Sequence, residues 1–97
     1  MYGTIAKLKL KEGKIKDLKK HMDVEIRDIP GIEDMYVYQM DNDPSELYMV
    51  VVFSSQDDYI KHAESEKSNR QYLKLMKLLE TEPEWHDGDL IFKRNYK

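Results

Sequence analysis

Apolar and polar side chains alternate along the first ten residues of the chain. Small or apolar residues occupy the even positions from Thr4 to Leu10, and Lys7 and Lys9 fall between them. A period of two is typical of a β-strand that buries one face. The segment Lys11-Glu12-Gly13 interrupts the alternation. The pattern therefore predicts a first strand that ends near Leu10.

Helical spacing follows this strand. Apolar residues recur three or four positions apart, at Ile15, Leu18, Met22 and Ile26. This spacing predicts an amphipathic helix with lysines on its solvated face. The segment Asp28-Ile29-Pro30-Gly31 is expected to end the helix, because proline and glycine together interrupt helical structure.

A second helical region precedes Thr81-Glu82-Pro83, which is expected to end it. Ser54 or Ser55 is placed to cap its start, with two aspartates in the first turn. The polar stretch 64–69 is expected to bend or interrupt the helix. An apolar stripe at i, i+3, i+4 and i+7 then resumes from Tyr72.

Three further strands complete the pattern. Residues 32–40 and 47–53 are expected to form a hairpin around a polar turn. Residues 85–93 form the last expected strand, with Gly88 as a bulge. The order β-α-β-β-α-β predicts an α+β fold of ferredoxin-like topology with an antiparallel four-stranded sheet, in a single domain over residues 1–97.

The apolar pattern also predicts a homodimer. The strand from Leu47 to Phe53 is apolar without alternation, and the strand before it carries large side chains on both faces. Helices on one face of a four-stranded sheet leave the other face in water. The chain has no residues left to cover that face. We therefore expect a second copy to cover it, so that the two sheets close into a dimeric α+β barrel.

Composition narrows the class of partner. The chain has no cysteine and no run of about 18 apolar residues that would span a membrane. Residues 1–22 carry seven lysines against two acids (+5), and residues 23–68 carry twelve acids against three bases (−9). We interpret the lysines as a solvated helix face, and residues 47–53 lack the basic-glycine-aromatic pattern of an RNA-recognition strand. We expect a cytoplasmic protein without a nucleic-acid or membrane partner.

Short segments spread along nearly the whole chain also occur in one known family. They are Leu10-Lys11-Glu12-Gly13, Pro30-Gly31, Val52-Phe53-Ser54-Ser55-Gln56-Asp57-Asp58-Tyr59, then His62 and Ser65, and Pro83-Glu84-Trp85-His86-Asp87-Gly88. In this order and spacing they resemble the antibiotic biosynthesis monooxygenase (ABM) domains of the dimeric α+β barrel superfamily. That family includes cofactor-independent oxygenases of quinone-forming pathways, haem-degrading oxygenases and small-molecule isomerases. The resemblance implies a homodimer with the same fold.

The resemblance also bears on cofactors. The haem-degrading branch uses an asparagine on the first strand, a tryptophan on the helix after the third strand and a later histidine as iron ligand. In this sequence Ala6, His62 and Tyr72 take those positions. We therefore expect neither haem nor any other cofactor. The cofactor-independent oxygenases are similar too, with Phe53 where they carry a tryptophan.

His62 is the candidate catalytic residue. It lies one helical turn after Tyr59, on the helix expected to border a cavity. An imidazole with a pKa near neutrality can accept a substrate proton or bind a phenol oxygen. The alternative is a hydrogen-bonded structural histidine at the helix edge. His21, which lies among lysines, is expected to be solvated.

Aromatic residues are the candidates for substrate binding, because they suit planar apolar ligands. The candidates are Tyr59, Tyr36, Tyr38, Trp85 and His86. The alternative for the strand tyrosines is packing between two sheets, and for Trp85 and His86 it is a strand edge with a bulge. Spacing typical of a metal site is absent from the sequence.

These observations predict an ABM-like small-molecule enzyme. The expected activity is cofactor-independent monooxygenation of an aromatic or quinone-like substrate. The alternative is a non-catalytic dimeric domain of the same fold that binds a ligand or serves in a stress response. Saturable binding of a hydrophobic ligand is the cheapest test of whether a small-molecule site exists.

Overall fold

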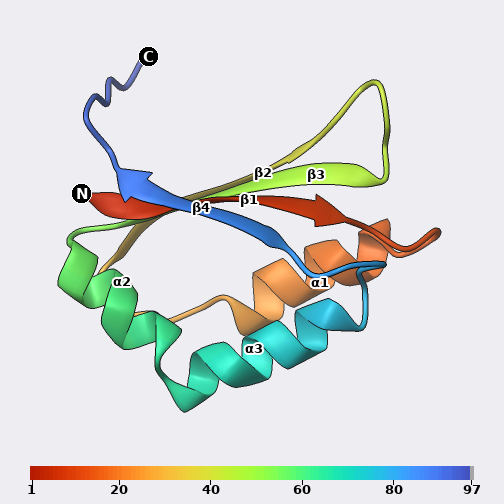
Figure 1. Cartoon of the computed structure of the whole chain (residues 1–97), viewed down its shortest axis with the longest axis horizontal. Helices are drawn as coiled ribbons and strands as arrows, with labels where there is room; N and C mark the ends of the chain where they lie inside the picture. Colours follow the sequence, from red (N-terminus) through yellow and green to blue (C-terminus); the bar gives the residue numbers. More distant parts are fainter. Residues whose placement is uncertain (97) are drawn as a thin grey trace.

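Four antiparallel strands form one sheet in the computed structural model of the chain, which describes residues 1–96. The strands are β1 (Tyr2–Lys9), β2 (Ile32–Gln39), β3 (Glu46–Phe53) and β4 (Glu84–Asp89), in the spatial order β2-β3-β1-β4. The helices are α1 (Ile15–Glu25), α2 (Gln56–Ala63) and α3 (Glu66–Met76), and all three lie on one side of the sheet (Figure 1). This order confirms the predicted ferredoxin-like fold, with the last helical region divided in two.

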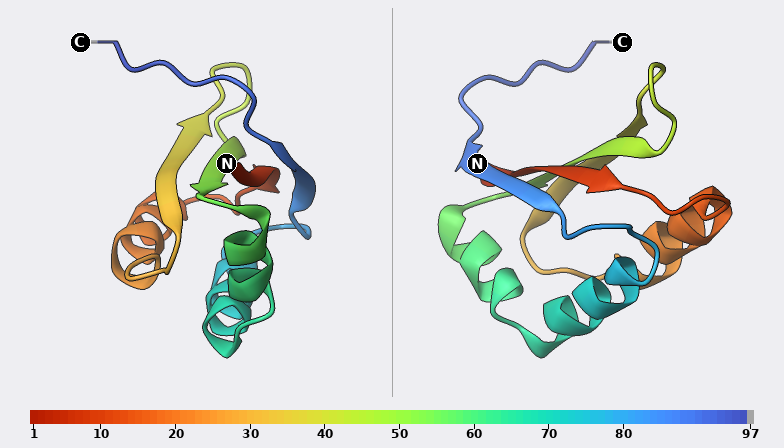
Figure 2. Two further views of the ribbon diagram at one scale, coloured as in Figure 1. Left: turned by 90° about the vertical axis from the view of Figure 1, so that its left-hand side faces the viewer. Right: turned by 45° about the vertical axis from the view of Figure 1, so that its right-hand side comes forward.

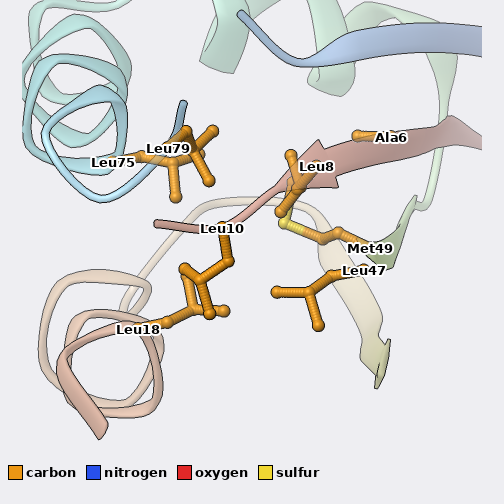
Figure 3. Close-up of a cluster of buried hydrophobic side chains, with 8 residues drawn as sticks. All are labelled: Ala6, Leu8, Leu10, Leu18, Leu47, Met49, Leu75 and Leu79. Carbon is orange, nitrogen blue, oxygen red and sulfur yellow. The ribbon is translucent and has the colours of Figure 1, made fainter. Parts of the chain in front are cut away.

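The alternation in β1 places one of its faces in the core. Thr4, Ala6 and Leu8 are each at most 5% exposed, whereas Ile5 and Lys7 on the other face are exposed. The buried face packs against the helices through one apolar cluster (Figure 3). The cluster consists of Ala6, Leu8, Leu10, Leu18, Leu47, Met49, Leu75 and Leu79.

Serine caps explain why the second helical region is two helices. Ser55 Oγ accepts a hydrogen bond from the backbone N–H of Asp58 at 3.1 Å and so caps α2. Ser65 Oγ accepts one from the N–H of Ser68, also at 3.1 Å, and caps α3. Each cap satisfies an N–H that has no partner within its own helix. The predicted interruption is therefore confirmed and lies between Ala63 and Glu66.

The last strand is shorter than the predicted range 85–93. In the sheet β4 pairs only with β1, and Tyr2, the first residue of β1, lies opposite Asp89. One more hydrogen bond, from the Leu90 N–H to the Met1 carbonyl, follows this last pair. The predicted bulge at Gly88 was wrong, because Gly88 pairs in regular register with Gly3. The irregular register lies in β2 instead, between Ile32 and Asp34.

The face of the sheet opposite the helices, here called the outer face, carries exposed aromatic and aliphatic groups. Tyr36 and Tyr38 are each more than half exposed, and Ile5 is 49% exposed. Residues 90–96 leave the sheet on the side away from the helices (Figure 2). An ion pair of 2.6 Å between Lys93 Nζ and Asp34 Oδ2 connects this segment to β2. Across residues 1–96, none of the helices has the length and apolar character to cross a bilayer.

Candidate functional site

A cavity of about 470 Å³ lies between the helices and the side of the sheet that faces them. Its size falls within the range of small-molecule sites. The wall is mainly apolar and includes Ile26, Ile29, Ile32, Met35, Met49 and Leu75. A few polar side chains interrupt this wall, and they determine what the cavity can do chemically.

His62 lines the cavity from α2 and is half-buried. Its ring stacks on Phe53, with 5.6 Å between the ring centroids and 29° between the planes. Burial lowers the pKa of His62 from its ordinary value of 6.5, and the Lys67 ammonium lowers the pKa further. The imidazole is therefore neutral at pH 7, which is the form that can accept a proton.

Tyr59, one turn earlier on α2, reaches across to β4. Its hydroxyl donates a hydrogen bond of 2.8 Å to Asp87 Oδ1. Its ring packs edge-on against Phe53 at 5.5 Å and tilted against Tyr2 at 5.4 Å. Burial raises the pKa of Tyr59 to about 12, helped by the hydrogen bond to Asp87 and its negative charge. The phenol therefore stays protonated and donates its hydrogen bond to Asp87.

A second histidine lines the cavity from α1. His21 is only 8% exposed, so the expectation that it is solvated was wrong. Burial lowers its pKa, the charge of Glu25 opposes that shift and the charge of Lys74 adds to it. Nearby, the buried Gln71 donates from Nε2 to the Glu25 carbonyl at 2.7 Å. Both histidines are thus neutral in the cavity at pH 7.

The electrostatic character of the cavity follows from its lining. Within residues 1–96, the lining includes one carboxylate, Asp87, and no lysine or arginine. Asp87 belongs to an exposed stretch of β4, which places it at the mouth of the cavity. In the same part of the chain, no three His, Cys, Asp or Glu side chains come together in a way that would hold a metal ion.

The structure brings three of the six predicted site residues together. His62, Tyr59 and Trp85 all line the cavity. Tyr36 and Tyr38 project from the outer face, and His86 also lies on that side, 3.1 Å from Glu84 Oε1. These three do not line the cavity.

Asp87 and His21 also line the cavity but were not among the predicted site residues. Period-two alternation from Trp85 puts residue 87, rather than His86, on the same face of β4. A helical spacing of three from Leu18 likewise puts His21 on the buried face of α1. Both patterns were present in the sequence. Their use required knowing which face of each element meets the cavity.

Comparison with known proteins supports the fold. Residues 1–71 match the sequence profile of the family described as antibiotic biosynthesis monooxygenase. This range includes His62, Tyr59 and His21 but not Asp87. No curated protein matches the chain.

Several solved structures are similar over nearly the full length. One from Chloroflexus aurantiacus, named for the same family, has a TM-score of 0.80 at 18% identity and covers 97% of this chain and 96% of its own. Another of that name from Nitrosomonas europaea has a TM-score of 0.74 at 18% identity, covering 95% and 100%. A conserved protein from Methanosarcina mazei has a TM-score of 0.78 at 21% identity, covering 90% and 89%. At these identities the similarity shows a shared fold.

Proposed function

The chain belongs to the antibiotic biosynthesis monooxygenase family, and from this premise we propose that it binds a small aromatic molecule between sheet and helices and oxygenates it without a cofactor. The cavity of about 470 Å³ carries the proposal. Its apolar wall and few polar groups suit a planar ring system with one or two oxygen substituents.

The proposed chemistry needs only a proton acceptor and molecular oxygen. A phenol that loses its hydroxyl proton becomes electron-rich enough to reduce O₂ itself. With 1-naphthol as the example, one oxygen atom bonds to the ring carbon para to the hydroxyl. The other leaves as water, with the hydroxyl hydrogen and the hydrogen of that carbon. The product is 1,4-naphthoquinone, so atoms and electrons balance.

His62 is the proposed base. Its lowered pKa keeps it neutral at pH 7 and therefore able to accept the hydroxyl proton. It lies in the cavity wall beside Phe53, so a ring bound against that wall comes next to the imidazole. A positioned general base contributes roughly 10²–10⁴-fold in rate.

We also propose that the protein acts as a homodimer. Exposed tyrosines on the outer face and the exposed apolar residues Ile91 and Phe92 after β4 support this part of the proposal. Burying such surface against a second copy would remove it from water.

The test combines binding with oxygen consumption. Calorimetric titration of 1-naphthol under nitrogen should give saturable binding with one site per chain. In air, an oxygen electrode and the absorbance of 1,4-naphthoquinone should report turnover. His62→Ala should bind 1-naphthol but lose at least about 100-fold in rate. Lys61→Ala, at the neighbouring exposed position of α2, serves as the control and should match the wild type.

The outcomes separate the two candidate functions. Binding without oxygen uptake would leave the chain a ligand-binding domain and overturn the oxygenase proposal. Absence of saturable binding would overturn the small-molecule site itself. Equal rates for His62→Ala and the wild type would remove His62 as the base.

A further inference from the structure

We propose that Asp87, acting through Tyr59, determines which ligands the cavity accepts. The Tyr59–Asp87 pair selects molecules that present a hydrogen-bond donor and carry no negative charge. This inference rests on the proposed function, because the pair lies in the wall of the same cavity. It assigns a specificity-determining role to a residue beyond the stretch that matches the family profile.

Tyr59 and Asp87 form one corner of the cavity, and a count of their hydrogen-bond donors and acceptors shows what this corner can bind. A phenol hydroxyl has one proton, and that of Tyr59 is donated to Asp87 Oδ1 at 2.8 Å. The Thr4 hydroxyl also faces Tyr59 Oη, and the lone pair left on that oxygen can only accept. An ionised carboxylate has no proton, so Asp87 Oδ2 can only accept as well. The corner therefore binds a hydroxyl or amino group through the ligand's own hydrogen.

The rest of the cavity lining offers no positively charged side chain that would stabilise a bound anion, as far as residues 1–96 show. No lysine or arginine lines the cavity within residues 1–96. His21 and His62 are neutral at pH 7, because burial lowers the pKa of each. A carboxylate or phenolate ligand would lose hydration and meet the negative charge of Asp87, which disfavours its binding.

The same corner places a ligand hydroxyl next to the proposed base. Tyr59 and His62 are three residues apart on α2, so they lie on one face of the helix. Both rings contact Phe53, at centroid distances of 5.5 and 5.6 Å. A naphthol whose hydroxyl donates to Tyr59 Oη is thus bound as the neutral phenol beside the imidazole, and its single proton must turn from Tyr59 Oη to His62 before it is transferred. Tyr59 and Asp87 act as positioning residues for the proton transfer.

Three ligands of one ring system test the selectivity. 1-Naphthol donates a hydrogen bond, 1-methoxynaphthalene can only accept one, and 1-naphthoate is an anion at pH 7. Each is titrated calorimetrically into the full chain under nitrogen, which prevents oxygenation. Wild type should bind 1-naphthol about 10-fold more tightly than either of the others, as expected for one hydrogen bond to a polarised acceptor.

Three variants locate the origin of that preference. Asp87→Ala removes the acceptor of the Tyr59 proton, which the tyrosine can then donate to a ligand. The roughly 10-fold preference for 1-naphthol should fall to near one, and 1-naphthoate should bind more tightly than in the wild type. Tyr59→Phe keeps the ring and removes the oxygen, so affinity should fall for 1-naphthol alone. Glu84→Ala removes a carboxylate from the opposite face of the same strand and should keep the wild-type preference.

The outcomes distinguish this inference from the proposed function. If wild type binds the three ligands equally, or Asp87→Ala keeps the preference for 1-naphthol, the inference fails while the small-molecule site stands. If wild type binds none of them saturably, the proposed function fails and the inference falls with it. Circular dichroism of each variant confirms that the compared proteins are folded.

Discussion

Gly31 combines a backbone requirement with a packing requirement at a single residue. It has a φ of +83°, a conformation that side-chain-bearing residues rarely adopt. A Cβ added there would lie 2.6 Å from Cβ of Asp58 on α2. Gly13 has a similar φ of +75°, but nothing lies within 4 Å of an added Cβ. The two glycines therefore separate backbone strain from steric conflict.

Alanine substitutions at these glycines should have different costs. Gly13→Ala should lower the free energy of unfolding by about 1–2 kcal/mol, the cost of a left-handed conformation. Gly31→Ala should lower it by about 1–3 kcal/mol more, because the α2 backbone near Asp58 must also move. Urea denaturation followed by circular dichroism measures both. Equal losses would contradict the close approach at Gly31.

His21 makes stability depend on pH. Burial holds its folded-state pKa below the unfolded value near 6.5, although Glu25 opposes and Lys74 assists the shift. The unfolded chain therefore binds a proton more readily than the folded chain. The stability contribution is complete above about pH 6.5 and is lost as the pH falls toward the lowered pKa. His62 contributes with the same sign.

His21→Gln should flatten this dependence. The melting temperature of the wild type should fall between about pH 7 and pH 5, and that of His21→Gln should fall less. Gln56→Ala is the control, because this exposed residue at the start of α2 carries no titratable group, and its slope should match the wild type. Identical slopes for His21→Gln and the wild type would show that the buried imidazole does not titrate in this range.

At the scale of elements, the break between α2 and α3 positions the residues of both helices that line the cavity. Ser65 Oγ caps α3 and also donates to the His62 carbonyl at 2.6 Å. One side chain thus ends the turn that carries His62 and begins the helix that carries Gln71. A continuous helix would send residues 66–76 in another direction, away from the contact of α3 with α1.

Ser65→Ala should destabilise the chain by about 1 kcal/mol, the usual cost of losing an N-cap. Ser65→Asp should recover most of that loss, since aspartate caps equally well and its charge suits a helix start. Thermal denaturation compares the two variants. Similar losses for both would mean that the hydrogen bond to the His62 carbonyl, which aspartate cannot donate, contributes more than the cap.

At the scale of the whole molecule, helices cover one face of the sheet and leave the outer face open (Figure 2). Val50 lies on the outer face, paired with Ile5 and Tyr36. Val51, the next residue, points to the other side and lines the cavity. Two adjacent valines thus report on two different interfaces, one proposed between copies and one within the chain.

Charging each valine should separate these interfaces. Light scattering of the wild type at micromolar concentration should give about twice the 11.6 kDa of one chain. Val50→Asp should give a folded monomer, because two copies cannot bury a carboxylate facing its symmetry mate. Val51→Asp should lower the melting temperature instead, because the charge lies beneath the helices. A monomeric wild type would overturn the proposed dimer.

The sequence by itself determined the elements and their order. Period-two and helical patterns, proline and glycine breaks and serine caps are local, so the strands and helices could be predicted to within a few residues. The side-by-side placement of Tyr59 and His62 was predictable for the same reason, since both belong to one helix.

Only the tertiary structure determined how distant segments complete the cavity. Asp87 reaches Tyr59 because β4 pairs with β1, a contact between the two ends of the described chain. His21 is buried because α1 packs against α3, although its sequence neighbours are lysines. The end of β4 depends on where β1 begins. Each of these features depends on packing between elements far apart in sequence, and a local pattern cannot specify which faces will meet.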